Sequence, residues 1–133
     1  SPDVEMSVME IRWGIIPDMG FTRTLMGALR PDQLAELTWT GRRVDADEAS
    51  RIGLVTRLTE DPVADALTLA RTIASKSPDA IRAAKRLMRE ASQLDTAAAF
   101  VLETDLQVGL LGSANQIEAV MAGFAKRAPV FED

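Results

Sequence analysis

The sequence of 133 residues contains no cysteine, no histidine and no tyrosine. Without cysteine there is no disulfide, no redox thiol and no thiolate zinc site. Without histidine, the Ser-His-Asp and Cys-His arrangements that activate a nucleophile are excluded within this chain. Any catalysis must therefore use carboxylates, lysine, arginine, hydroxyls or backbone N–H groups, and we expect no metal site.

Basic side chains are also few, because 15 lysines and arginines stand against 20 aspartates and glutamates, for a net charge of −5. Duplex nucleic acid needs a basic surface to neutralise its phosphates, so this balance argues against a nucleic-acid partner. No apolar run approaches the ~20 residues of a membrane span, and no signal segment opens the chain. We therefore expect a cytoplasmic protein of one compact domain without a membrane span.

Helices dominate the expected order of elements, after one strand at the start. Alternating apolar and polar side chains predict a strand over residues 4–11, and a brief strand is expected over residues 54–58. Capping residues, prolines and glycines predict helices over residues 22–29, 31–40, 45–52, 61–74, 77–91, 96–111 and 113–124. The first strand has no evident partner. Because a strand cannot satisfy its backbone alone, it is either an exchanged arm or part of a sheet on a segment absent from this sequence, and we expect the latter.

Two carboxylates stand out in residues 9–20, MEIRWGIIPDMG. Glu10 lies near the end of the expected strand, and Asp18 follows in a loop that contains several apolar residues, which suggests a packed loop. Burial raises the pKa of a carboxylate and a nearby charge separates two such values, so a pair can divide general acid and general base work. The alternative is that Glu10 is exposed and that Asp18 only caps the following helix.

The same segment resembles the crotonase superfamily, also called the enoyl-CoA hydratase/isomerase family, whose stretch reads P-E-I-x-L-G-x-x-P-G-x-G. The family continues with T-x-R-L and then L-T-G-x-x-x-x-A-x-E-A-x-x-x-G-L-V. The counterparts here are residues 10–20, 22–25, 40–42 and 46–55. Residues 126–131, KRAPVF, resemble the family's C-terminal K-R-x-P-x-F. The motifs keep their order over nearly the whole chain.

The resemblance implies an α/β protein of the crotonase-like (ClpP/crotonase) fold, of which this chain is the mostly helical C-terminal half. Residues 1–60 would form the end of the spiral core with the acid-bearing loop, and residues 61–133 a helical oligomerisation region. The family's N-terminal half, with the oxyanion hole and most coenzyme A contacts, has no counterpart here. A homo-trimer or hexamer is expected, and the broad apolar circumference of residues 96–111 agrees with such packing.

The resemblance also implies an enzyme of fatty acid metabolism, such as β-oxidation, with an acyl-CoA substrate and no tightly bound cofactor. In the family's hydratases two glutamates bracket a water molecule, and Glu10 matches the second. In its dienoyl-CoA isomerases a glutamate and an aspartate move protons at the spacing of Glu10 and Asp18. Hydratases commonly have glycine where Asp18 stands, so the choice between hydration and isomerisation stays open. Both reactions need a positioned carboxylate and N–H donors for a developing oxyanion.

Two basic residues near the end of the chain complete the implied site. By the resemblance, Lys126 and Arg127 lie where relatives approach the nucleotide end of coenzyme A, often across a subunit boundary. The phenylalanine that usually precedes this motif by three residues aligns with Gly123, and Phe124 is shifted by one. Four further basic residues share one helix face and are expected to be solvated, or else to meet phosphates: Arg82, Lys85, Arg86 and Arg89. A non-catalytic alternative also stays open, namely an oligomerising helical fragment without an oxyanion hole.

Overall fold

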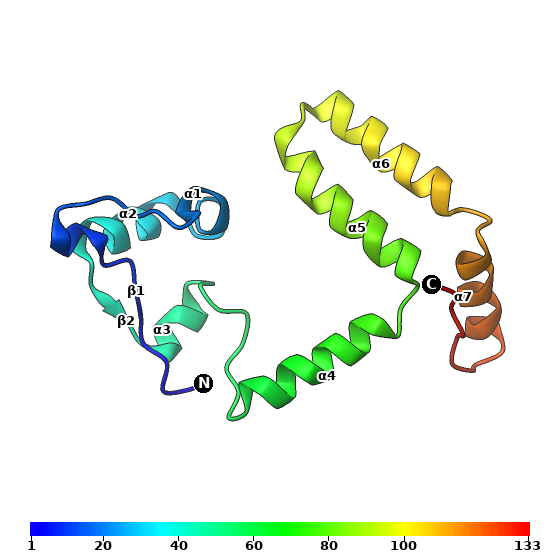
Figure 1. Ribbon diagram of the computed structural model, residues 1–133, viewed down its shortest axis with the longest axis horizontal. Coiled ribbons are helices and arrows are strands. Elements are labelled where there is room, and N and C mark those ends of the chain that lie inside the picture. The colour runs from blue at the N-terminus through cyan, green and yellow to red at the C-terminus, as the bar shows by residue number, and fades with distance from the viewer. The chain divides into compact units, whose positions relative to one another are not determined.

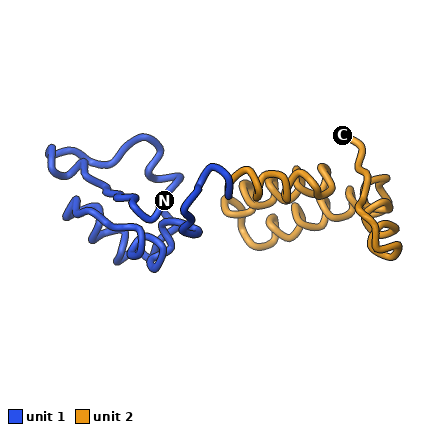
Figure 2. The backbone as a smooth tube through the Cα atoms, turned by 90° about the horizontal axis from the view of Figure 1, so that it is seen from below, with its two compact units in different colours: residues 1–65 blue, residues 66–133 orange.

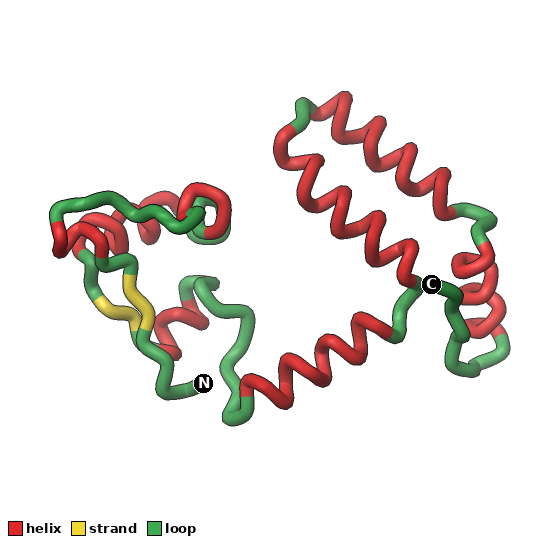
Figure 3. The backbone as a smooth tube through the Cα atoms, viewed as in Figure 1, coloured by secondary structure: helices red, strands yellow, loops and turns green.

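The computed structural model describes all 133 residues and divides the chain into two units, Ser1–Asp65 (unit 1) and Ala66–Asp133 (unit 2), as Figure 2 shows. Helices make up most of unit 2, whereas unit 1 combines shorter helices, long loops and one small sheet (Figures 1 and 3). Unit 1 contains β1 (Met6–Ser7), the 3-10 helix η1 (Glu10–Trp13), α1 (Phe21–Thr24), α2 (Pro31–Thr40), β2 (Arg43–Val44) and α3 (Ala46–Arg51). Helix α4 (Pro62–Ala74) begins in unit 1 and ends in unit 2. Unit 2 continues with α5 (Pro78–Glu90), η2 (Ala91–Gln93), α6 (Thr96–Leu110) and α7 (Ala114–Phe124).

The first strand is shorter than the sequence predicts and has its partner inside the chain. Strand β1 pairs antiparallel with β2, so that Met6 faces Val44 and Ser7 faces Arg43. The expected strand over residues 4–11 is therefore wrong in length, because its last residues turn into η1. The sheet contains only these two strands, which leaves one edge of each strand open.

The strand expected over residues 54–58 does not form. The backbone N–H groups of Leu54 and Val55 both donate to the carbonyl of Ala49, at 2.8 and 3.3 Å. These bonds wrap the chain around the end of α3, so the two N–H groups are not free to join a sheet. The helix expected over residues 22–29 is likewise shortened to α1, since Met26 and Leu29 form an isolated bridge.

The core of unit 1 is small and lies between α2 and β2. Leu29, Leu37 and Val44 are buried together, and four half-buried apolar residues pack against them: Val8, Leu34, Ile52 and Leu54. Helix α2 begins at a proline, and it ends at Gly41, which adopts φ 60° and donates its N–H to the carbonyl of Leu37. Both ends agree with the prediction, because proline suits a first helical turn and glycine suits a left-handed C-cap.

A three-residue ion-pair network joins α2 to α3. The guanidinium of Arg42 donates two hydrogen bonds of 2.8 Å to the carboxylate of Glu48 and one of 2.7 Å to Glu36. The hydrogen bonds from Arg42 lower the pKa of Glu48 below its ordinary value. The network fixes the two helices beside the buried cluster, so the family-like segment of residues 46–55 has a structural role.

In unit 2, α5, η2 and α6 form a helical hairpin in which the two long helices pack side by side. Each long helix from α4 onward begins within one residue of its predicted start, because a side chain caps its first turn. The caps are Asp61 on the N–H of Ala64, Ser77 on Ala80, Asp95 on Ala98 and Ser113 on Gln116. The element order of unit 2 therefore follows from local signals. No helix of the structure is both long enough and apolar enough to cross a membrane.

Large apolar side chains remain exposed on the helices of unit 2 and on the loop of residues 13–20. Trp13 is 76% exposed, Met19 94% and Phe124 84%, and only six hydrophobic residues of the chain are buried. The expected packing of the loop is therefore not found within the chain. The chain exposes 9930 Å². Two separate compact globules of half this mass would together expose only about 8,200 Å². The amphipathic faces have thus formed without most of the surfaces that would cover them.

Candidate functional site

Glu10 lies at the start of the 3-10 turn η1, directly after the paired strand. The N–H of Gly14, which adopts φ 71°, closes this turn on the carbonyls of Glu10 and Ile11. The residue is half-buried, and its oxygen Oε2 is fully buried without a hydrogen-bond partner. A buried carboxylate oxygen without a donor is costly, so it marks a site that calls for an explanation.

The turn that carries Glu10 is held against the end of α2. The hydroxyl of Ser7 donates to the carbonyl of Gly41 at 3.1 Å. A Cβ atom at Gly41 would come within 3.0 Å of Ile11 Cγ2. A side chain at this position would force the Ile11 side chain to shift, so glycine favours the close approach of η1 to α2. The sequence predicts Gly41 as the end of a helix. Its second role, allowing the close approach of η1, follows only from the structure.

Asp18 lies on an exposed turn in the same unit. Its backbone carbonyl accepts from the N–H of Phe21 at 2.9 Å, across Met19 at φ 52° and Gly20 at φ 84°. Two left-handed residues in succession are typical of a type I′ turn. Helix α1 is capped by Gly20 and has no side-chain cap, so the carboxylate of Asp18 does not serve as a helix cap. Glu10 Oε2 is buried, so neither a fully exposed Glu10 nor a capping Asp18 describes this structure.

Apolar side chains surround the two carboxylates in sequence and stand exposed in the structure. Trp13, Ile16 and Met19 lie between or beside them, and each is more than 70% exposed. A surface of this kind excludes water once it is covered, which strengthens electrostatic interactions with a carboxylate nearby. The arrangement can therefore provide proton transfer in an apolar environment.

Lys126 and Arg127 lie in unit 2, where the chain leaves α7. The N–H of Arg127 donates to the carbonyl of Ala122 at 3.1 Å, and that of Lys126 to Gly123 at 3.2 Å. These two bonds form a Schellman motif, with Lys126 at the left-handed position at φ 51°. Both side chains are exposed, but their surroundings differ.

The guanidinium of Arg127 is occupied by a carboxylate. Its two terminal nitrogens donate to the oxygens of Glu118 at 2.5 and 2.8 Å. The N–H of Val130 donates to the same carboxylate at 2.7 Å. The hydrogen bonds from Arg127 and Val130 lower the pKa of Glu118 from 4.5 to about 2. In contrast, the structure gives the ammonium of Lys126 no hydrogen bond or ion pair.

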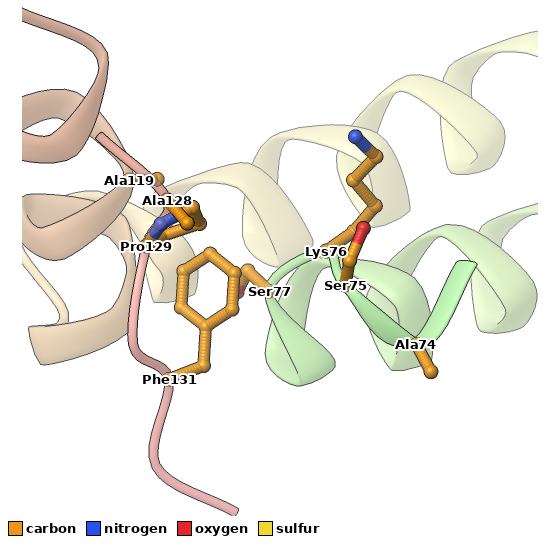
Figure 4. A pocket seen from close by; sticks show the side chains of 8 residues that line it. All are labelled: Ala74, Ser75, Lys76, Ser77, Ala119, Ala128, Pro129 and Phe131. Atoms are coloured by element: carbon orange, nitrogen blue, oxygen red, sulfur yellow. The ribbon is translucent and has the colours of Figure 1, made fainter. Parts of the chain in front are cut away.

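A cavity of about 530 Å³ lies between the turn that joins α4 to α5 and the C-terminal tail of residues 127–133 (Figure 4). Its lining residues are Ala74, Ser75, Lys76, Ser77, Ala119, Ala128, Pro129 and Phe131. Figure 4 shows the ring of Phe131 beside Pro129 and Ser77. The tail that follows Lys126 thus forms one wall of this cavity and is held from α7.

The other basic cluster behaves as a solvated helix face. Arg82 pairs with Asp79 and Asp133, and Arg86 pairs with Glu90 at 3.1 Å. Two of the four basic residues, Arg82 and Arg86, therefore have carboxylate partners within the chain. The structure contains no group of three or more residues suited to hold a metal ion.

The sequence analysis does not identify Glu118 as a site residue. The available signal is its spacing of one helical turn from Asn115, another polar residue on α7.

Comparison with known proteins gives a consistent set of matches. The family model described as enoyl-CoA hydratase/isomerase matches residues 3–133. The protein named probable enoyl-CoA hydratase echA8 from Mycobacterium bovis is 34% identical over 124 residues, which are 92% of this chain and 48% of that protein. The carnitinyl-CoA dehydratase of Escherichia coli is 32% identical over 138 residues, or 98% of this chain and 52% of that protein.

Solved structures give the same result. The enoyl-CoA hydratase from Bacillus anthracis superposes with a TM-score of 0.90 at 30% sequence identity, over 98% of this chain and 51% of that chain. The chain therefore spans about half the length of the relatives that it matches.

Proposed function

Since this chain belongs to the enoyl-CoA hydratase/isomerase family, we propose that it is the C-terminal part of an enzyme that acts on enoyl-CoA thioesters. The predicted membership of the crotonase superfamily and the predicted fold class are confirmed. The proposed reaction is hydration of a carbon–carbon double bond, or proton transfer across one, with coenzyme A as part of the substrate and no tightly bound cofactor. The names of the matched relatives support this substrate class.

The observation that carries the proposal is the buried, unpartnered Oε2 of Glu10 on a turn fixed by β1 and Gly41. A carboxylate held in this way is available to a proton on a substrate or on a water molecule. In hydration, the water oxygen bonds to the β-carbon and a proton is added to the α-carbon. Between these two events the thioester has an enolate-like state. Glu10 would carry a proton in this exchange, and N–H donors from outside this chain would stabilise the oxyanion.

Asp18 is the proposed second proton carrier. Its exposed carboxylate stands on a turn in which Met19 adopts a left-handed conformation, and such strain is often found at functional positions. A second carboxylate allows a proton to be removed at one carbon and returned at a distant one. Asp18 therefore favours isomerisation, whereas Glu10 serves both reactions.

The tail with Lys126 and Arg127 is proposed to meet the phosphates at the nucleotide end of coenzyme A. Residues 1–60 would contribute the acid-bearing end of the core, and residues 61–133 would join subunits into a trimer or hexamer. Support for assembly comes from exposed apolar side chains on α4, α6 and α7, such as Val63, Phe100 and Phe124. A place in cytoplasmic fatty acid β-oxidation completes the proposal.

Replacement of Glu10 tests the proposal. In the enzyme at its full natural length, Glu10→Gln is expected to lower kcat for a 2-enoyl-CoA by about 10²–10⁴-fold, because glutamine cannot carry the proton. KM should change little, and circular dichroism should show an unchanged fold. The control Glu60→Gln removes an exposed carboxylate of the same type outside the site and should leave kcat unchanged. Equal rates for both variants would refute the role of Glu10.

Asp18→Asn separates the two reactions. Loss of dienoyl-CoA isomerisation with hydration intact would identify the isomerase, while loss of neither would remove Asp18 from the mechanism. The non-catalytic alternative makes a different prediction. It requires that the chain assemble through its helices and bind enoyl-CoA thioesters weakly or not at all.

A further inference from the structure

Lys126 occupies a position that helices usually give to glycine. In the Schellman motif that ends α7, Lys126 adopts φ 51° although its Cβ atom disfavours this region. A strained residue persists only when its surroundings fix it, and such residues are common at functional sites. The side chain that results is exposed, and its ammonium has no partner in the structure.

The tail after Lys126 is fastened to α7 at a first point, Glu118. This carboxylate receives three hydrogen bonds, two from Arg127 and one from the N–H of Val130. Arg127 also donates to the carbonyl of Ala128 at 3.0 Å. Arg127 is thus paired with a carboxylate, and its three hydrogen bonds run back to the protein although the side chain remains 46% exposed.

The second point is Asn115, one turn before Glu118 on the same face of α7. Asn115 is only 6% exposed. Its side-chain oxygen accepts from the N–H of Glu132 at 2.9 Å, and its nitrogen donates to the carbonyl of Glu132 and to Asp79, both at 2.8 Å. The tail is therefore bound at two positions along α7, and the same amide links it to the first turn of α5.

We propose that Asn115, Glu118 and Arg127 form a latch that positions Lys126, and that Lys126 alone of the basic pair contacts the phosphates of coenzyme A. This inference rests on the proposed function. It divides the pair of basic residues into one ligand and one positioning residue. The latch binds the chain that follows Lys126 back to α7, which precedes it, so the left-handed conformation of Lys126 is maintained without a ligand.

Substrates with and without the nucleotide test the latch. The enzyme at its full natural length is assayed with a 2-enoyl-CoA and with the matching pantetheine thioester, which lacks the nucleotide and its phosphates. Lys126→Ala is expected to raise KM for the CoA thioester about tenfold. Glu118→Gln and Arg127→Ala should raise it to a similar extent by misplacing Lys126. All three variants should change KM for the pantetheine thioester much less than KM for the CoA thioester.

A charge exchange distinguishes a positioning arginine from a phosphate ligand. The double variant Glu118→Arg with Arg127→Glu restores the ion pair with reversed ends. If Arg127 acts only through the latch, this variant should recover much of the KM lost in Arg127→Ala. If Arg127 binds phosphate directly, the added glutamate should raise KM further, and that result would overturn the proposal.

Lys126→Gly provides a variant that is not expected to unfold. It relieves the left-handed strain, so the urea midpoint should rise while KM for the CoA thioester still increases about tenfold. A KM that stays at the original value would overturn the role of Lys126. Equal losses with both thioesters in the latch variants would show general damage and overturn the latch. Failure of the unaltered enzyme to bind any CoA thioester would instead overturn the proposed function itself.

Discussion

Gly41 sets the distance between the end of α2 and the turn that carries Glu10. Its backbone is left-handed at φ 60°, and Ile11 Cγ2 of η1 lies only 3.0 Å from the position that a Cβ atom would take. Gly53 is also left-handed, at φ 82°, but nothing lies within 4 Å of its Cβ position. Substitutions at these two glycines therefore allow the cost of backbone strain to be measured apart from the cost of a steric contact.

We expect Gly53→Ala to destabilise unit 1 by about 1 kcal/mol through strain alone. Gly41→Ala should cost roughly 1–3 kcal/mol more, because the new methyl group displaces Ile11 and with it the turn of Glu10. Urea unfolding followed by tryptophan fluorescence measures both effects, since Trp13 and Trp39 lie in unit 1. Equal destabilisation by the two substitutions would show that the approach of η1 to Gly41 is not tight in solution.

At the scale of elements, local capping residues predict where the long helices begin. The length of the first strand depends instead on contacts between residues far apart in the sequence. The starts of the long helices follow from caps such as Asp95, whose carboxylate accepts from the N–H of Ala98 at 2.8 Å. The length of β1 could not be predicted, because pairing with β2 depends on residues far along the chain. The spacing of Glu10 and Asp18 in the sequence makes them candidates, whereas Glu118 is not identified because its partners Arg127 and Val130 lie further along the chain, beyond the helix.

The cap of α6 provides a direct check on this account. Asp95→Ala should destabilise unit 2 by about 1 kcal/mol, because the N–H groups of the first turn lose their acceptor. Asp95→Asn should be nearly neutral, since asparagine caps about as well as aspartate. Thermal unfolding followed by helical circular dichroism tests this pair of variants. A loss in Asp95→Asn as large as that in Asp95→Ala would mean that charge, not capping, matters there.

The bond between α7 and the tail should respond to acid. Hydrogen bonds from Arg127 and Val130 lower the pKa of Glu118 in the folded protein from its ordinary value of 4.5 to about 2. A carboxylate whose pKa is lowered on folding stabilises the fold fully at pH values above its pKa in the unfolded chain. This stabilisation is lost as the pH falls from about 4.5 toward 2. Glu118→Gln should therefore unfold with a shallower dependence on pH in this window. Urea midpoints at several pH values measure the difference, and parallel curves for the two proteins would contradict the assigned cause.

At the scale of the whole molecule, the main feature is the excess of exposed apolar surface. Few of the large hydrophobic residues are covered by the chain itself, although the helices are regular and well capped. Amphipathic helices derive most of their stability from packing of the apolar face. We therefore expect the 133 residues alone to be marginally stable, and to be stabilised when those faces are covered.

A dye that fluoresces on apolar surfaces measures this directly. The isolated chain should bind such a dye strongly and should run above 14.4 kDa in sedimentation experiments, because exposed faces associate. The enzyme at its natural length should bind much less dye per chain. A monomeric isolated chain without dye binding would show that the apolar faces rearrange to cover one another.

The Ser7–Gly41 hydrogen bond connects residues 34 positions apart. Closing a loop of that length costs about 3 kcal/mol of chain entropy before any contact is gained. The α5–α6 hairpin, in contrast, is made of near neighbours and can form within microseconds. Folding should thus begin in unit 2, which does not contain Glu10 and Asp18, and finish when β1 pairs with β2. The N-terminal strand would then be the last segment to gain protection and the first that a protease can release.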